Sequence, residues 1–370
     1  MNFALNEEQE ALAQSLEDYL TDRYTRSGPN VVDQWAAFAK LGWLGAALPE
    51  DVGGSAGGPV ETMVVMEAFG RHAVVEPYLA TVVLGAEILR LADEPASCAA
   101  WLGRVADGSV QLALAYAEPR APFDVHNVAT TAVNAAGLWQ LDGRKSMVLN
   151  GAGADAITVS ARISGHRRDR AGIGLFLVPR GTAGVQMRPY VTQDGFAASD
   201  LTLGKVCLPA AALLVADGGA ALERVTDAAA AAVCAMAVGS MSSCVEATGA
   251  YLKLRRQFGR PLASFQALQH RMVDMQVALE ESRSLTLAAT IALQSGHEVG
   301  KAVSAAKITA GEAARLIGEE SVQMHGGIGM TEDYQIGRLY KRLLTCAALF
   351  GDVEHHVGRY AGEFALVGAA

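Results

Sequence analysis

The chain has 370 residues, enough for two or three domains with substantial buried cores. Apolar residues make up 51% of it but aromatic residues only 6%, and alanine supplies much of the difference, which favours closely packed helices. The formal net charge of −9, with no basic block, argues against nucleic acid as a partner, so an anionic substrate must be met by local cations.

The five cysteines are scattered, without a CxxC pair or the spacing of a metal site, so we expect small buried side chains and no bound metal. The first ten residues carry acids where a signal peptide carries bases. An alanine run at 228–232 continues into further apolar residues, but two serines and Glu246 follow soon, which favours a core helix over a membrane span. We therefore expect a cytoplasmic protein that does not enter a membrane.

Residues 1–107 are predicted to form an all-helical N-terminal domain. Leucines recur near the helical period between positions 5 and 20, and Asn6 offers a helix cap followed by two acids. A turn cluster at 49–54 separates these early helices from a long apolar helix near 60–69.

Residues 108–217 change to short strand-like runs punctuated by Gly and Pro turns, which predicts a middle β-barrel or sandwich domain. The runs lie at 110–116, 138–141, 156–159 and 174–178.

One segment of this region, Gly151 to Ala156, fits the GxGxxA pattern of a dinucleotide-binding turn. That fingerprint requires a helix directly afterwards, with its N-terminus on the pyrophosphate. The residues that follow are strand-like, so the segment is interpreted as a β-turn.

Residues 218–370 return to helical periodicity, with long helices expected at about 219–257, 263–294 and 299–325. Together with the last segment they are long enough for a C-terminal four-helix bundle. The predicted fold is therefore α+β: helical domain, β domain, helical bundle.

Two motifs in the bundle carry the most chemistry. Arg255 and Phe258, in the run RRQFGRP, place a guanidinium and an aromatic ring at an expected helix end, and an arginine fork suits a pyrophosphate. Gln323 stands before the pair Gly326–Gly327, which would let a ligand approach bare backbone. Alone, each motif has an ordinary explanation, a helix-turn-helix with Pro261 opening the next helix and a glycine helix cap; together they favour a nucleotide site.

These motifs, with the N-terminal run LGWLGAALPEDVGG, resemble those of the acyl-CoA dehydrogenase family, and the order of helical, β and helical domains agrees. The resemblance implies FAD as cofactor, an acyl-CoA thioester as substrate, a trans-2-enoyl-CoA product and an electron-transfer flavoprotein as acceptor. In that family both motifs act across a subunit interface, on the pyrophosphate and adenosine end of FAD. The cofactor-binding residues so implied are Arg255, Gln257, Phe258, Gln266, Gln323, Gly326 and Gly327.

The middle domain departs from the family pattern. In the loop that resembles Thr-Glu-Pro-Gly-Ala-Gly-Ser-Asp, Glu118 persists, but Arg120 and Pro122 replace glycines and Phe123 replaces a serine. Pro122 also lacks an N–H donor. Where relatives flank the flavin ring with Trp and Thr, the chain has methionine at 147 and leucine at 149.

The catalytic base is also missing from the positions where the family carries it. Proton abstraction from Cα needs a carboxylate within hydrogen-bond reach. Most relatives carry it before a glycine near the C-terminus, where this chain has Phe350, and others carry it on the long helix, near Ala229 or Ala230. Asp352 could be a displaced base, although an acid beside glycine more often caps a turn, and Glu246 lies about four turns too late.

These losses lead to three hypotheses. The first is a subunit of a heterotetramer, two copies each of two chains, whose partner subunit carries the base and holds FAD; the resemblance places such enzymes in β-oxidation of fatty acids or steroid side chains. The second is a self-sufficient homotetrameric flavoenzyme that uses Asp352. The third is a structural paralogue without catalysis.

Overall fold

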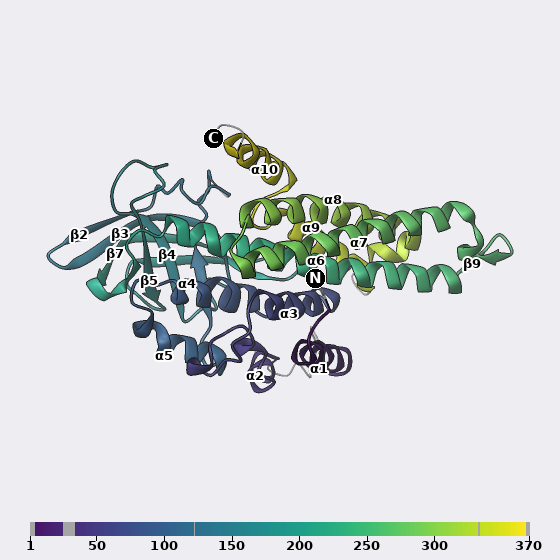
Figure 1. The fold of residues 1–370 in the computed structure, drawn as a ribbon, viewed down its shortest axis with the longest axis horizontal. Helices are drawn as coiled ribbons and strands as arrows, with labels where there is room; N and C mark the ends of the chain where they lie inside the picture. Colours follow the sequence, from purple (N-terminus) through teal and green to yellow (C-terminus); the bar gives the residue numbers. More distant parts are fainter. Residues whose placement is uncertain (1–3, 25–33, 122, 332–333, 368–370) are drawn as a thin grey trace. The chain divides into compact units, whose positions relative to one another are not determined.

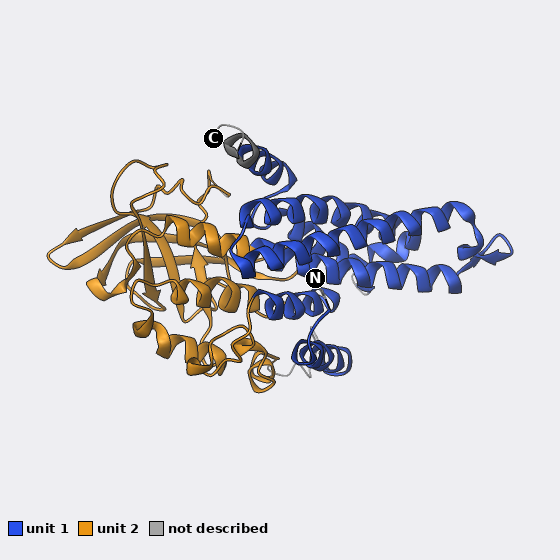
Figure 2. Ribbon diagram, viewed as in Figure 1, with its two compact units in different colours: residues 1–30, 59–74, 230–370 blue, residues 31–58, 75–229 orange. Residues whose placement is uncertain are grey.

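The computed structural model describes residues 4–24, 34–121, 123–331 and 334–367. They divide into two compact units, coloured separately in Figure 2. One unit comprises Met1–Asn30, Pro59–Val74 and Ala230–Ala370, and the other comprises Val31–Gly58 and Val75–Ala229. The three-domain boundaries expected from the sequence stay a prediction.

The N-terminal third is helical, as predicted. Asn6 caps α1 with a reciprocal capping box, because its side chain accepts from the Gln9 N–H while the Gln9 side chain accepts from the Asn6 N–H. Its helices are α1 (Glu7–Arg23), α2 (Gln34–Lys40), α3 (Pro59–Arg71), α4 (Glu87–Arg90) and α5 (Pro95–Ala106), with a π-helical stretch at Leu79–Ala86.

The middle of the chain forms one eight-stranded sheet with the order β6-β7-β3-β2-β4-β5-β8, and β1 pairs in parallel with β4. The strands are β1 (Leu112–Ala115), β2 (Thr131–Ala135), β3 (Leu138–Leu149), β4 (Ala156–Arg162), β5 (Ile173–Pro179), β6 (Val185–Val191), β7 (Ala197–Pro209) and β8 (Leu213–Val215). A buried cluster that includes Leu141, Val159 and Phe176 fills its core. The segment Gly151–Gly153 is a turn that leads into β4, so the β-turn interpretation is confirmed.

Long helices form the remainder, as predicted: α6 (Gly219–Leu254), α7 (Gln266–Ser295), α8 (Val299–His325), α9 (Gln335–Ala348) and α10 (Val353–Val367), drawn in Figure 1. The helix α6 is long and apolar enough to cross a membrane, yet 89% of its most apolar window is buried within the protein. This burial agrees with the expectation of a core helix.

The helices α3 and α6 approach so closely that only glycine fits at their contact. A Cβ added to Gly70 would lie 1.9 Å from the Met236 carbonyl oxygen, and one added to Gly239 would lie 1.8 Å from the Glu67 carbonyl oxygen. The Ser240 hydroxyl also donates to the Gly70 carbonyl (2.8 Å), which satisfies a carbonyl at the end of α3.

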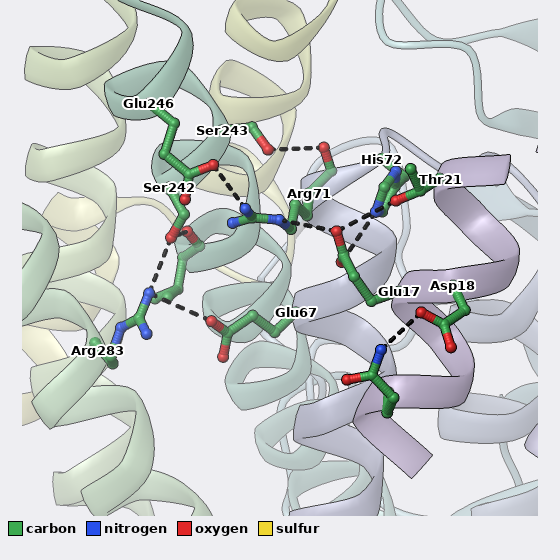
Figure 3. A network of polar contacts seen from close by, with 12 residues as sticks. Glu17, Asp18, Thr21, Glu67, Arg71, His72, Ser242, Ser243, Glu246 and Arg283 are labelled. Carbon is green, nitrogen blue, oxygen red and sulfur yellow. Dashed lines mark hydrogen bonds and ion pairs between the residues drawn. The ribbon is translucent and has the colours of Figure 1, made fainter. Parts of the chain in front are cut away.

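Charged side chains extend the same junction, as Figure 3 shows. Arg71 on α3 contacts Glu246 on α6 (2.6 Å) and Glu17 on α1 (3.6 Å). His72 lies 3.1 Å from the second oxygen of Glu17. Arg283 on α7 donates to the Ser242 hydroxyl of α6 (2.9 Å). The network therefore ties α1, α3, α6 and α7 together, and Glu246 is ion-paired.

We predict that Gly239→Ala lowers the free energy of unfolding by about 1–3 kcal/mol, because the new methyl group overlaps the α3 backbone. Urea denaturation followed by circular dichroism measures the change. The control is Gly358→Ala on α10, where an added Cβ meets open space. It should stabilise the protein by about 0.5–1 kcal/mol because it removes a glycine from a helix. Equal effects of the two substitutions would contradict the packing argument.

Candidate functional site

The first nucleotide motif lies on a short hairpin at one end of the bundle (Figure 1). After α6 ends at Leu254, β9 (Arg256–Gln257) pairs with β10 (Arg260–Pro261), and Gln257 faces Arg260. Phe258 and Gly259 both have positive φ angles, 52° and 80°. A two-residue loop of this conformation is a type I′ turn. Pro261 does not open the next long helix, because α7 begins at Gln266; it directly precedes a short 3-10 helix at Leu262–Ser264.

The side chains of this hairpin face solvent. Arg255, Gln257 and Gln266 are exposed, and Phe258 retains 88% of its surface. The Phe258 ring meets Phe265 edge-on (6.0 Å), and the Arg260 guanidinium lies 4.0 Å above the Phe265 ring. These contacts order the hairpin and leave the Arg255 guanidinium accessible to an anion.

The second motif ends α8. Gln323 is exposed, and Gly326 follows His325 with φ 65° and ψ −144°, a conformation that favours glycine. An added Cβ at Gly326 or Gly327 would meet nothing within 4 Å. The backbone of both residues is therefore open to close approach by a ligand.

Tyr251 and His325 bring the two motifs together. The Arg255 N–H donates to the Tyr251 carbonyl (2.8 Å), and the Tyr251 ring stacks on His325 at 4.4 Å, one residue before Gly326. Sequence reasoning missed Tyr251. Its only signal is its position one helical turn before Arg255.

The two family positions of the base meet in one apolar cluster. Ala230, Ala231 and Cys234 of α6 pack with residues of α7 and α8, and Phe350 packs against this cluster. Ala230 is 1% exposed. A carboxylate introduced among these side chains would lose its hydration, so the cluster itself is suited to hydrocarbon.

A buried lysine and a buried histidine hold the segment that carries Phe350. The Lys307 ammonium donates to the carbonyls of Cys346 and Leu349, each at 2.8 Å. Burial, Lys307 and neighbouring cations lower the pKa of His356 to about 3. The neutral ring can then donate from Nε2 to the Phe350 carbonyl (3.1 Å). These contacts fix Phe350 at φ 58°, a conformation that a bulky residue rarely adopts.

Asp352 lies at the surface and directly precedes α10. Its Oδ1 accepts from the His355 N–H at 2.9 Å, the geometry of a helix N-cap. This contact is the local role that an acid beside glycine was expected to have.

The positions that would flank a flavin ring lie in the other unit. Met147 has a φ of 54° beside a β-bulge of β3, and the Tyr190 hydroxyl lies 3.5 Å from its sulfur. Leu149 is buried and lines a hollow of about 60 Å³ with residues that include Phe196 and Leu79. Ligand pockets usually enclose about 300 Å³ or more. Within this unit, that hollow is too small for a tricyclic ring.

Glu118, retained from the family loop, forms a buried ion pair. Its carboxylate accepts from Lys145 Nζ (2.9 Å), from the N–H groups of Ala129 and Thr130 (2.9 Å each) and from the Thr130 hydroxyl. Burial opposes ionisation of Glu118, but these donors outweigh it and hold the pKa of the carboxyl below its usual range. Burial lowers the pKa of Lys145 to about 8 against the attraction of Glu118. The pair therefore anchors the loop to β3.

Arg120 is exposed and Phe123 half-buried, whereas Pro122 lies outside the described residues. No cluster of three or more metal-ligating side chains occurs in the described parts of the chain.

Comparison with known proteins gives the family. Three family models match in order: the acyl-CoA dehydrogenase N-terminal domain at residues 6–109, the middle domain at 113–207 and the C-terminal domain at 217–362. The chain belongs to the acyl-CoA dehydrogenase family. Its order of helical, β-sheet and helical regions is the fold of that family, as the sequence predicted.

Individual relatives align with this chain over nearly its full length. YngJ, a probable acyl-CoA dehydrogenase of Bacillus subtilis, is 27% identical over 356 residues, which cover 92% of this chain and 93% of YngJ. The Tcur3481-Tcur3483 steroid ACAD variant is 31% identical with a TM-score of 0.87, covering 98% of this chain and 99% of that chain. The ChsE4-ChsE5 complex of Mycobacterium tuberculosis has a TM-score of 0.89 at 23% identity and 99% coverage of both chains, which supports the fold alone.

Members of this family are FAD-dependent flavoproteins. The exposed guanidinium of Arg255 and the open backbone at Gly326 and Gly327 suit the nucleotide half of FAD. The hollow beside Leu149 is too small for a flavin ring, and the Met147 side chain carries no N–H or O–H donor for one.

We predict that Lys145→Met destabilises the protein by about 3–5 kcal/mol, because it leaves the Glu118 carboxylate buried without its cation. Adding Glu118→Gln should recover part of this loss, since no buried charge remains. Urea unfolding of the two single variants and the double variant forms a thermodynamic cycle. Strictly additive losses would show that the ion pair is not the interaction that holds the loop.

Proposed function

We propose that this acyl-CoA dehydrogenase chain is one of two kinds of subunit in a heterotetramer that oxidises an acyl-CoA thioester to the trans-2-enoyl-CoA. It would contribute Arg255, Gln257, Phe258 and Gln266, with the Gln323 to Gly327 turn, to FAD held chiefly by the second subunit. That second subunit would carry the catalytic base.

One asymmetry carries this proposal. The end of the bundle that would face the nucleotide is exposed. It carries the guanidinium of Arg255, amide side chains and the open backbone of Gly326 and Gly327. Both family positions of the base instead lie in an apolar cluster around Phe350 and Ala230. If the whole site had lost its function, we would expect substitutions at the nucleotide end as well as at the positions of the base.

The proposed roles follow from side-chain chemistry. Arg255 would pair with the pyrophosphate, and the backbone at Gly326 and Gly327 would lie against the adenosine. Bound FAD supplies the hydride acceptor of this family. Since Phe350 takes no proton, this chain would assist the reaction by holding the cofactor, and a carboxylate of the second subunit would remove the α proton.

The surface of the bundle supports an assembly. Large apolar side chains are exposed on or beside its long helices, and aromatic residues and methionine are typical of interface cores. They are Leu254, Phe258, Val273, Val277, Leu316, Ile328 and Met330. Val277 also lines an open groove of about 720 Å³ on α7 and α8. Two similar structures, Tcur3481-Tcur3483 and ChsE4-ChsE5, are themselves named as pairs of components.

The substrate class and cellular setting complete the proposal. We favour a fatty-acyl or steroid side-chain thioester, since the 31% identical structure is a steroid ACAD. The electrons would pass to an electron-transfer flavoprotein. All five cysteines are free, which suits a reducing cytoplasm.

We predict that the chain purified alone retains no stoichiometric FAD, whereas the assembly co-purified with its partner subunit does. In that assembly Arg255→Ala should weaken FAD binding by about 10- to 100-fold, the equivalent of one charge-assisted contact. The matched control is Arg315→Ala, which removes the same charge from the exposed face of α8, where Arg315 pairs with Glu319. Isothermal titration with FAD measures both variants. A lone chain that binds one FAD and desaturates acyl-CoA would overturn the split site.

A second prediction distinguishes the proposed heterotetramer from a homotetramer that uses Asp352 as its base. Asp352→Asn keeps an N-cap acceptor but removes the carboxylate, so stability should change little. We expect an unchanged rate of flavin reduction by acyl-CoA, measured by stopped-flow absorbance in the assembly. A fall of about a hundredfold or more would instead assign Asp352 as a general base.

A further inference from the structure

We infer that His325 is a positioning residue that holds the two nucleotide motifs of the bundle at a fixed spacing. The Gly326–Gly327 turn and the Arg255 hairpin come from segments about seventy residues apart in the sequence. A nucleotide that contacts both segments needs them to be held at a constant distance from each other. The His325 ring occupies the position between them.

Aromatic rings pack against His325 from two elements. The Tyr251 ring of α6 stacks on it with centroids 4.4 Å apart and planes at 29°. The Tyr334 ring, directly before α9, lies 5.2 Å away at 52°. His325 is itself 3% exposed, so these contacts are shielded from water.

Hydrogen bonds connect this stack to both motifs. His325 Nδ1 lies 2.8 Å from the Ser321 carbonyl, one turn back on α8, and donates to it. This bond fixes the ring plane at the residue that precedes Gly326. On the other side, the Tyr251 carbonyl accepts the Arg255 N–H (2.8 Å), and the Arg255 carbonyl accepts the Leu262 N–H (2.8 Å) at the far side of the hairpin. One ring stack and one hydrogen bond thus join His325 to Arg255, and two further hydrogen bonds fix the His325 ring and close the hairpin.

The ring chemistry fits this role better than simple filling of the core. Burial lowers the pKa of His325, so the ring is neutral and one nitrogen is free to donate to Ser321. An aliphatic side chain could fill the volume, but it would present neither a flat face to Tyr251 nor a donor to the carbonyl of α8. A phenylalanine would keep the flat face only. The arrangement therefore predicts a graded response to substitution.

Hydrogen exchange of the full-length chain tests the inference without any ligand. In His325→Leu, amide exchange should rise about tenfold in both segments, 255–262 and 326–331, because the stack that couples them is lost. In His325→Phe the hairpin should keep nearly wild-type exchange. Tyr251→Leu, which removes the opposite face of the stack, should release the same two segments if His325→Leu fails to fold. The control is Val303→Ala, which removes buried atoms near the start of α8, about 33 Å along the helix from His325.

The outcomes are distinct. Release of 326–331 alone, or the same pattern in Val303→Ala, would overturn the positioning role. The functional part of the inference rests on the proposed function, and FAD retained by the co-purified assembly tests it: His325→Leu should lose FAD, and His325→Phe should keep it. Coupled exchange with undiminished FAD in His325→Leu would overturn a role in nucleotide binding. If the wild-type assembly holds no FAD, the proposed function fails, and coupled exchange still supports the fixed spacing.

Discussion

The close approach of α3 and α6 is the constraint on which the bundle depends. Two glycines, Gly70 and Gly239, let the helix backbones touch, and the Arg71 network locks their direction. Because α6 is a single helix of 36 residues, fixing it at this crossing also fixes Ala230 toward one end and Tyr251 toward the other. One family position of the base and the hairpin motif are thus held by one rigid element.

The two ends of α6 face opposite physical demands. Around Ala230 the side chains of the cluster are hydrocarbon, and the buried Lys307 ammonium donates to backbone carbonyls of the segment that carries Phe350. Beyond Tyr251 the chain leaves regular helix, and every polar group of the hairpin is either paired locally or exposed. A phosphate is stabilised at such an end because guanidinium and backbone N–H groups can meet it directly. The proposed division of labour between subunits follows from this contrast.

Sequence patterns predicted the elements with long periodic repeats. They did not predict the features that depend on contacts between residues far apart in the chain. The long helices and the cap at Asn6 were correct because periodicity and capping are local. Strands β2, β6, β7 and β8 were not among the predicted runs, and of these β2 and β6 are largely exposed. The expected helix ended at about 257, whereas α6 ends at Leu254. The hairpin that follows was not predicted, because its turn places an aromatic residue, Phe258, at positive φ. The Tyr251–His325 stack joins residues far apart in sequence, and no single-chain pattern announces such a pair.

The uncovered hydrophobic side chains at the hairpin also bear on how such a chain is produced. Phe258 and Leu254 are almost fully exposed to water. A copy of this chain without its partner subunit would therefore present an apolar surface that binds chaperones and favours self-association. Balanced synthesis of the two proposed subunits would keep that surplus small, and coupled translation from adjacent reading frames is the simplest way to achieve it. The hairpin would then require the cell to make the two subunits in equal amounts, in addition to positioning the cofactor.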